Sequence, residues 1–155
     1  MLSLDLPSLS QQKRKEYKTN KEEVINIYNQ LNKQVFNSEL ILPEIVLLKK
    51  PKKYFGECKA IDFVPTYTDR SNCIICLSTN WICQQWLVMI LAHEMCHQYQ
   101  WDIESIKRIK NKRKPILSHG PTFFKFRSRL NELGIPLKKL YSVDKWLKTQ
   151  NLFAV

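Results

Sequence analysis

Apolar residues recur at helical spacing from Lys21 onward and predict a first helix. Asn20 precedes it as a capping residue, and Glu22 and Glu23 suit the positive end of its dipole. The Asn37–Ser38 pair is expected to break the pattern. The apolar positions that share one side of the 3.6-residue period are Val24, Ile25, Ile27, Tyr28, Leu31 and Val35.

The next region alternates short apolar runs with turn residues, a pattern typical of strands. Residues 44–48 form an extended run, the charged stretch 49–53 is a turn, and 54–64 form a second extended stretch. A polar loop at 65–72 leads to a short, fully apolar strand at 73–77. We therefore expect two or three strands between the first helix and the rest of the chain.

The most apolar segment predicts a buried central helix over residues 81–101. It is apolar nearly all round as far as Ala92, as expected for a helix inside the core. Residues 78–80 (Ser-Thr-Asn) would cap it. A basic loop follows, and then a last helix over 122–133, introduced by Gly120-Pro121.

The end of the last helix and the tail carry their own signals. Gly134 is expected to end the last helix. The apolar residues expected to dock the tail onto the domain are Leu137, Leu140, Tyr141, Trp146, Leu147 and Phe153.

This order of elements predicts an α+β domain in which a small sheet packs against a central helix and flanking helices. Apolar residues make up 44% of the 155 residues and aromatic residues 11%, which is globular composition and excludes a disordered chain. We expect residues 1–20 to form a flexible polar leader and residues 21–155 to form one domain.

Compartment signals are consistent with an intracellular protein. The longest apolar run, Trp86–Ala92, is too short to span a membrane. The N-terminus carries its positive charges after its apolar part, the wrong order for a secretory signal. The five cysteines are an odd number and favour reduced thiols. We expect a cytoplasmic or nuclear (nucleoid-associated) monomer that is not secreted and has no membrane partner.

Positive charge is concentrated in the last third of the chain. The net charge is +11, and residues 101–155 hold 13 of the 25 Lys and Arg but only 4 of the 14 Asp and Glu. Such a patch attracts nucleic acid, although a solvated basic loop is the alternative. Lys49, Lys50, Lys52 and Lys53 either extend this surface or form a solvated turn. The densest run contains Lys107, Arg108, Lys110, Lys112, Arg113 and Lys114.

The central helix contains the sequence His93-Glu94-Met95-Cys96-His97, an HExxH motif. Residues four apart lie on one helix face, so both imidazoles can reach one Zn²⁺ ion. Glu94 lies beside the first ligand, where it can take the proton of a water that the metal makes acidic. The motif therefore predicts one catalytic Zn²⁺, with Glu94 as the catalytic residue.

His119 is the remaining histidine of the chain and lies at the predicted junction of loop and helix. Catalytic zinc sites use three protein ligands and keep one position open, and three histidines would supply that set. The alternative for His119 is a surface histidine near a helix start.

These motifs resemble those of the SprT-like metalloproteases, including the Spartan type. That family pairs an HE(M/L)xH helix with a downstream HGxxF(K) segment, which here correspond to residues 91–97 and 119–125. Residues 21–133 are similar in their order of elements. The resemblance implies a zincin-like fold, zinc bound by His93, His97 and His119, and Glu94 as general base or acid. It also implies a protease that cleaves proteins crosslinked to DNA and is activated by DNA.

The sequence departs from that family in two places. Many members carry a four-cysteine zinc ribbon after the protease domain, and no cysteine follows Cys96 here. The basic run Lys107–Lys114 has no residue-by-residue counterpart among the family's DNA contacts. The expected function is therefore a zinc metalloprotease with a protein or peptide substrate and with DNA as partner. The alternative is a basic nucleic-acid-binding module with a structural or vestigial zinc site.

Several other residues have two interpretations each. Cys73, Cys76 and Cys96 are either core thiols or metal and redox groups, and core packing is favoured. The aromatic residues around the basic run either stack unpaired bases or pack in the core; they are Trp101, Phe123, Phe124 and Phe126. The tyrosines that could stabilise an oxyanion are Tyr67, Tyr99 and Tyr141, although each could equally be structural.

Overall fold

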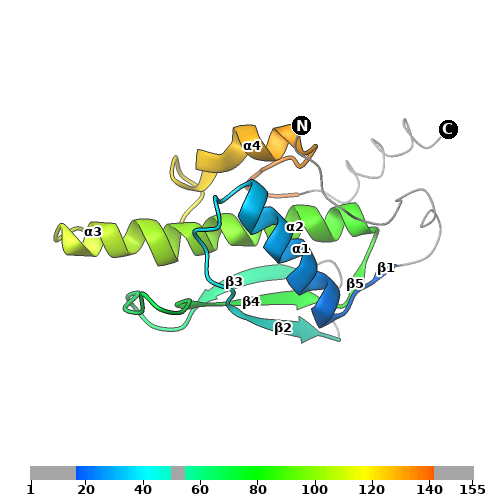
Figure 1. Ribbon diagram of the computed structural model, residues 1–155, viewed down its shortest axis with the longest axis horizontal. Helices are drawn as coiled ribbons and strands as arrows, with labels where there is room; N and C mark the ends of the chain where they lie inside the picture. Colours follow the sequence, from blue (N-terminus) through cyan, green and yellow to red (C-terminus); the bar gives the residue numbers. More distant parts are fainter. Residues whose placement is uncertain (1–16, 50–54, 142–155) are drawn as a thin grey trace.

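A three-stranded sheet and the long helix beside it form the centre of the protein (Figure 1). The computed structural model describes residues 17–49 and 55–141. The α+β class is confirmed. The elements are β1 (Tyr17–Lys18), α1 (Lys21–Gln34), β2 (Glu44–Leu48), β3 (Gly56–Ala60), β4 (Cys73–Ser78), β5 (Asn80–Trp81), α2 (Gln84–Tyr99), the π-helical segment η2 (Gln100–Ser105), α3 (Ile106–Lys110), the 3₁₀ turn η3 (Phe123–Phe126) and α4 (Arg127–Glu132).

Helix α1 forms where its apolar spacing predicts it. The Asn20 side chain accepts a hydrogen bond from the Glu23 backbone N–H at 2.8 Å, so the predicted cap is confirmed. The helix ends at Gln34. Asn37 and Ser38 then have φ of 55° and 60°, a left-handed conformation that cannot continue a helix.

The sheet has the strand order β2-β4-β3. Strand β4 is central and largely buried, as its apolar sequence predicts. Strand β2 runs parallel to it with Ile45 opposite Ile75, and β3 runs antiparallel with Gly56 opposite Leu77. All three predicted strands are present, although β3 covers only five of the residues 54–64.

Helix α2 is the buried central helix, but it begins later than predicted. Trp81 belongs to β5, where it pairs with Tyr17 of β1, and its indole N–H donates to the Ser78 carbonyl at 2.7 Å. Cys83 is the residue that precedes the first helical turn. The predicted cap at 78–80 is therefore wrong, because these residues serve the sheet.

The helical chain also continues farther than predicted. After α2 it passes through η2 and α3 to Lys110 as one continuous rod (Figure 1), so the first part of the predicted basic loop is helical. The Asp102 carboxylate in η2 accepts hydrogen bonds from Ser71 Oγ at 2.7 Å and from the Asn72 backbone N–H at 2.9 Å. These bonds join the loop before β4 to the widened turn of the helix.

The last predicted helix is divided between η3 and α4, and it ends before Gly134, which has φ of 75°. Beyond it, Leu137 is buried and Tyr141 is half-buried, so part of the tail docks as expected. Leu140 is 85% exposed and does not dock. Trp146, Leu147 and Phe153 lie outside the described residues.

The predicted leader and the second cationic turn are described only in part. Residues 17–20, assigned by the sequence to a flexible leader, form β1 and the α1 cap, because Tyr17 pairs with Trp81. Residues 1–16 lie outside the described residues. The same holds for Lys50, Lys52 and Lys53 of the second cationic turn, whereas Lys49 is described and exposed.

The core is built where α1, α2, β4 and the η3 region meet. Cys73, Cys76 and Cys96 are buried free thiols within the fold. Trp101, Phe123 and Phe126 are buried as well, which confirms core packing for these aromatic residues; Phe124 is half-buried. Among the described helices, none has the length and apolar character needed to cross a membrane.

Gly56 allows β3 to lie directly against α2. A Cβ atom at this position would overlap Ile90 Cγ2 and would lie 3.4 Å from Glu94 Cγ. Only a residue without a side chain permits this approach. The contact places the edge strand of the sheet next to Glu94.

We predict that Gly56→Ala destabilises the protein by about 1–3 kcal/mol, because overpacking forces β3 away from α2. Denaturant unfolding checks the change. Gly120→Ala is the matched control, since the nearest atom to its new Cβ would be Ser118 Oγ at 3.4 Å. Equal stability of the two variants would contradict the close approach.

Candidate metal centre

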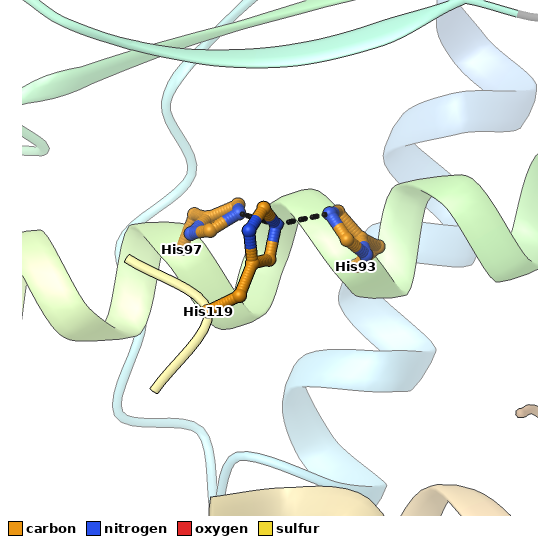
Figure 2. A group of neighbouring side chains, drawn as sticks. All are labelled: His93, His97 and His119. Atoms are coloured by element: carbon orange, nitrogen blue, oxygen red, sulfur yellow. Dashed lines mark hydrogen bonds between the residues drawn. The ribbon is translucent and has the colours of Figure 1, made fainter. Parts of the chain in front are cut away.

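Three histidine side chains converge at the middle of α2 (Figure 2). His93 and His97 are one helical turn apart on α2, and His119 reaches them from the segment between α3 and η3. His119 Nε2 lies 3.1 Å from His97 Nε2 and 3.3 Å from His93 Nε2. His93 is buried, and the other two are half-buried. The structure therefore brings the predicted third histidine to the predicted pair.

The donor set fits a metal ion. The ligating nitrogens of the three rings all lie within 4.8 Å of one another, and these residues could hold one ion. Nitrogens bound to one tetrahedral ion at 2.0–2.1 Å are separated by about 3.3 Å, close to the two measured separations. All three Nε2 atoms would present lone pairs to one cation when each ring carries its proton on Nδ1.

Gln100 fixes the orientation of the His97 ring. Its Oε1 lies 3.0 Å from His97 Nδ1, and its Nε2 donates to Thr122 Oγ1 at 2.8 Å. An amide oxygen only accepts, so His97 carries its proton on Nδ1 and presents an unprotonated Nε2. Thr122 follows His119 by three residues, so Gln100 also connects the third histidine's segment to the helix.

Burial keeps the helical histidines neutral. Desolvation, with smaller contributions from His97 and His119, lowers the pKa of His93 to about 3. Desolvation is also the main cause that lowers the pKa of His97. Neutral imidazole is the form that binds metals. Both side chains are therefore in the ligating state at neutral pH.

Glu94 lies beside the histidines and is 6% exposed. Its Oε2 is 4.0 Å from His93 Nε2. Desolvation raises the pKa of Glu94 to about 8, the charge of Glu57 adds to the increase, and a hydrogen bond from the Cys58 backbone opposes it. A cation at the histidines would favour the ionised carboxylate. The carboxyl group thus stands where it would exchange a proton beside an ion held by the histidines.

Aromatic rings enclose the histidines. The Phe123 ring centroid lies 4.5 Å from that of His97 and 4.7 Å from that of His93. The Tyr141 ring lies 5.4 Å from His93. An apolar surround strengthens electrostatic interactions at the site because it excludes water.

The supporting residues were not predicted from the sequence. Gln100 had a readable signal, because a polar residue three positions after His97 lies on the same helix face. No sequence signal indicated that Phe123 and Tyr141 pack against the histidines. Their contacts with His93 depend on how the C-terminal third folds back.

The three tyrosines considered as oxyanion donors have other partners or positions. The Tyr99 hydroxyl donates to Glu39 Oε2 at 3.1 Å. The Tyr141 hydroxyl donates to the Pro136 carbonyl at 2.9 Å. Tyr67 lies in the loop before β4 and lines a separate cavity with Asp102. None of the three tyrosines is therefore assigned as an oxyanion donor.

The basic run lies at the far end of the helical rod. Lys107, Arg108 and Lys110 are on α3, and Lys112, Arg113 and Lys114 follow in an exposed turn. Arg108 donates to the Lys114 carbonyl at 2.7 Å, which folds the turn back onto α3. None of these cations belongs to the metal centre.

Comparison with known proteins gives no family assignment: no family model matches the chain, and no curated protein matches it.

We predict that Gln100→Met lowers the affinity for Zn²⁺ about 10- to 100-fold, because His97 loses the acceptor that fixes its tautomer. Competition with a chromophoric chelator measures the affinity. Thr122→Val is the matched control, since it removes only the Gln100–Thr122 bond and should have a smaller effect. An unchanged affinity in Gln100→Met would show that Gln100 does not orient the ligand.

A second prediction concerns pH in the metal-free protein. The pKa of Glu94 rises from 4.5 to about 8 on folding, so the folded chain keeps a proton that the unfolded chain has lost. The stability from this group is complete below pH 4.5 and is lost as the pH rises through 8. Glu94→Gln removes the effect. The variant should gain more than about 1 kcal/mol over wild type between pH 5 and pH 9.

Denaturant unfolding at a series of pH values, with a chelator present, tests this expectation. The difference in unfolding free energy between Glu94→Gln and wild type should increase with pH. A difference that stays constant would mean that the carboxyl group is not desolvated in the folded protein.

Proposed function

We propose that the protein is a zinc-dependent endopeptidase of zincin-like type that acts on proteins bound to DNA. The convergence of His93, His97 and His119 beside Glu94 is the observation that carries this proposal. A structural zinc site needs four protein ligands and no base, whereas three ligands with a carboxyl group alongside suit hydrolysis.

Zinc is the metal that the donors favour. Three imidazoles are borderline ligands that suit Zn²⁺, and the separations of His119 Nε2 from its two neighbours agree with tetrahedral binding. When bound, Zn²⁺ would supply Lewis-acid chemistry that polarises a carbonyl group and makes water acidic.

The chain's own residues would then have distinct roles. Glu94 would accept the proton of the attacking water and return it to the leaving nitrogen of the peptide bond. The Cys58 backbone N–H that hydrogen-bonds Glu94 would hold the carboxylate in position. Gln100 would keep the His97 ring aligned, and Phe123 would limit the entry of water.

Strand β3 offers a place for the substrate backbone. Within the described residues β3 has β4 as its one neighbouring strand, and no described strand pairs with its other edge. An extended peptide can add to an open edge through main-chain hydrogen bonds. Because Gly56 brings β3 against Glu94, a peptide on this edge would pass the metal centre.

The cationic end of the rod supports the choice of a DNA-bound substrate. The residues beyond position 100 carry most of the excess positive charge, and exposed Lys and Arg neutralise phosphates. Lys107 follows His97 by ten residues, which is about 15 Å along a continuous helix. A protein held on bound DNA would therefore lie within reach of the metal centre.

The test is cleavage of a DNA-binding protein by the zinc-loaded chain, with and without single-stranded DNA. Glu94→Gln should keep one equivalent of zinc and lose at least about 100-fold in rate, because it cannot transfer the proton. His119→Ala should lose most of its zinc. Gel analysis gives the rate, and elemental analysis gives the metal content.

Glu132→Gln, the same change on the exposed surface of α4, is the matched control and should cleave like wild type. Full activity of Glu94→Gln would overturn the mechanism, and full zinc content of His119→Ala would overturn the ligand set. No cleavage by a wild-type chain that binds both zinc and DNA would favour a nucleic-acid-binding module with a structural or vestigial zinc site.

A further inference from the structure

A cavity of about 240 Å³ lies between the loop before β4 and the end of the helical rod, away from the metal centre. Tyr67 and Arg70 line it from the loop, and Lys107 and Lys110 line it from α3. Ile103 and Ile106 are apolar lining residues. The volume is smaller than the roughly 300–1,000 Å³ of drug-sized pockets, so the cavity suits one small group.

The loop side of the cavity is fixed in place. The Asn72 side chain accepts hydrogen bonds from the backbone N–H groups of Thr66 at 2.9 Å and Tyr67 at 2.8 Å, and it donates to the Tyr67 carbonyl at 2.9 Å. Asn72 itself donates through its backbone to Asp102 in η2. Tyr67 is therefore held at a set distance from the helical rod.

Tyr67 and Arg70 together form a stacking platform. The Arg70 guanidinium carbon lies 3.8 Å from the Tyr67 ring centroid, and the Tyr67 side chain remains 37% exposed. Both an aromatic ring and a guanidinium plane can stack on a nucleobase. The platform therefore matches a flat aromatic ligand.

The helix side carries unpaired positive charge. Lys107 and Lys110 are three residues apart on α3 and so lie on one face, and both are exposed. Within the described part of the chain, no ion pair holds either ammonium group. Two lysines on one face suit successive phosphates of one strand.

Two acidic residues, Asp102 and Glu39, also line the cavity, and they differ in how far they are already engaged by hydrogen bonds. Both oxygens of Asp102 already accept hydrogen bonds, from Ser71, Asn72 and Gln98. Glu39 accepts one from Tyr99 and lines the cavity. A carboxylate at the rim repels phosphates and acidic side chains alike, but it can accept a hydrogen bond from the ring N–H of a base such as thymine.

We infer that this cavity is a nucleotide-binding site for single-stranded nucleic acid, with one base stacked on the open face of the Tyr67–Arg70 pair and the flanking phosphates on Lys107 and Lys110. The inference deepens the proposed function. The binding of a base is argued from the cavity alone, whereas its role in bringing DNA-bound substrates to a protease rests on the proposed function. The cationic end of the rod would then recognise an unpaired base by stacking and would also attract the phosphates by charge.

The test is binding of a fluorescein-labelled oligothymidylate to the Glu94→Gln chain, measured by anisotropy over a range of salt. Tyr67→Leu should weaken binding about 5- to 100-fold through the loss of stacking, and Tyr67→Phe should restore it. A Lys107→Gln/Lys110→Gln double variant should lower the salt slope by about 1.4, the share of two phosphates in a single strand.

Lys112→Gln/Arg113→Gln is the matched control, because it removes the same charge from the same run but neither residue lines the cavity. Its affinity should fall less, and it should still prefer the oligothymidylate to an abasic strand of equal length. Equal loss in both double variants, with no preference over the abasic strand, would overturn the site in favour of diffuse charge. Displacement by polyglutamate as effective as by oligothymidylate would overturn it in favour of an acidic peptide.

The outcome is independent of the protease proposal. Binding is measured on a chain without the catalytic carboxylate, and repeating it with a chelator separates it from the metal. Base-dependent binding without proteolysis would leave the cavity assigned and the proposed function wrong. Proteolysis without base-dependent binding would support the proposed function and overturn the assignment of the cavity. A photocrosslink from 5-bromodeoxyuridine to Tyr67, located by mass spectrometry, gives a direct readout of the stacked base.

Discussion

The burial of α2 on all sides is the constraint on which the rest of the structure depends. The sheet packs on one side of the helix, and α1 and the η3 region contact it elsewhere (Figure 1). Such a helix has little freedom to rotate, because any rotation would expose apolar surface at about 25 cal/mol per Å². His93 and His97 are therefore held at one orientation, and Gly56 lets the sheet approach closely enough to reach Glu94.

The polar groups of the candidate metal centre remain compatible with this core because most of them have partners. Gln100 is fully buried, yet it contacts both His97 and Thr122. One amide thereby connects the helical ligands to the segment that carries His119. A buried amide without partners would destabilise the fold, so the same contacts that orient the ligands also permit a polar site inside an apolar helix.

The continuous rod from α2 to α3 joins two regions of different chemistry. The neutral histidines lie at its middle, and the exposed lysines lie at its end. Asp102 sits in the π-helical segment between them and fixes the loop that carries Tyr67 and Arg70. The widened turn therefore connects the rod to the cavity, so that the distance between the metal centre and the cationic end is set by one rigid element.

The sequence alone determined the features that depend on local spacing. The i, i+4 histidines, the apolar run of α2, the Asn20 cap and the break in helical pattern at Asn37–Ser38 follow from periodicity and backbone preference, and each is found in the structure. Tertiary structure decided where α2 begins, because Trp81 in β5 pairs with Tyr17 in β1, which lies 64 positions earlier. It also decided that the basic run starts on a helix, that Gln100 supports His97, and that Tyr67 and Lys107 line the same cavity. Such contacts join residues far apart in the chain, and the free energy that selects them comes from packing and from the pairing of buried polar groups, neither of which has a period that a sequence displays.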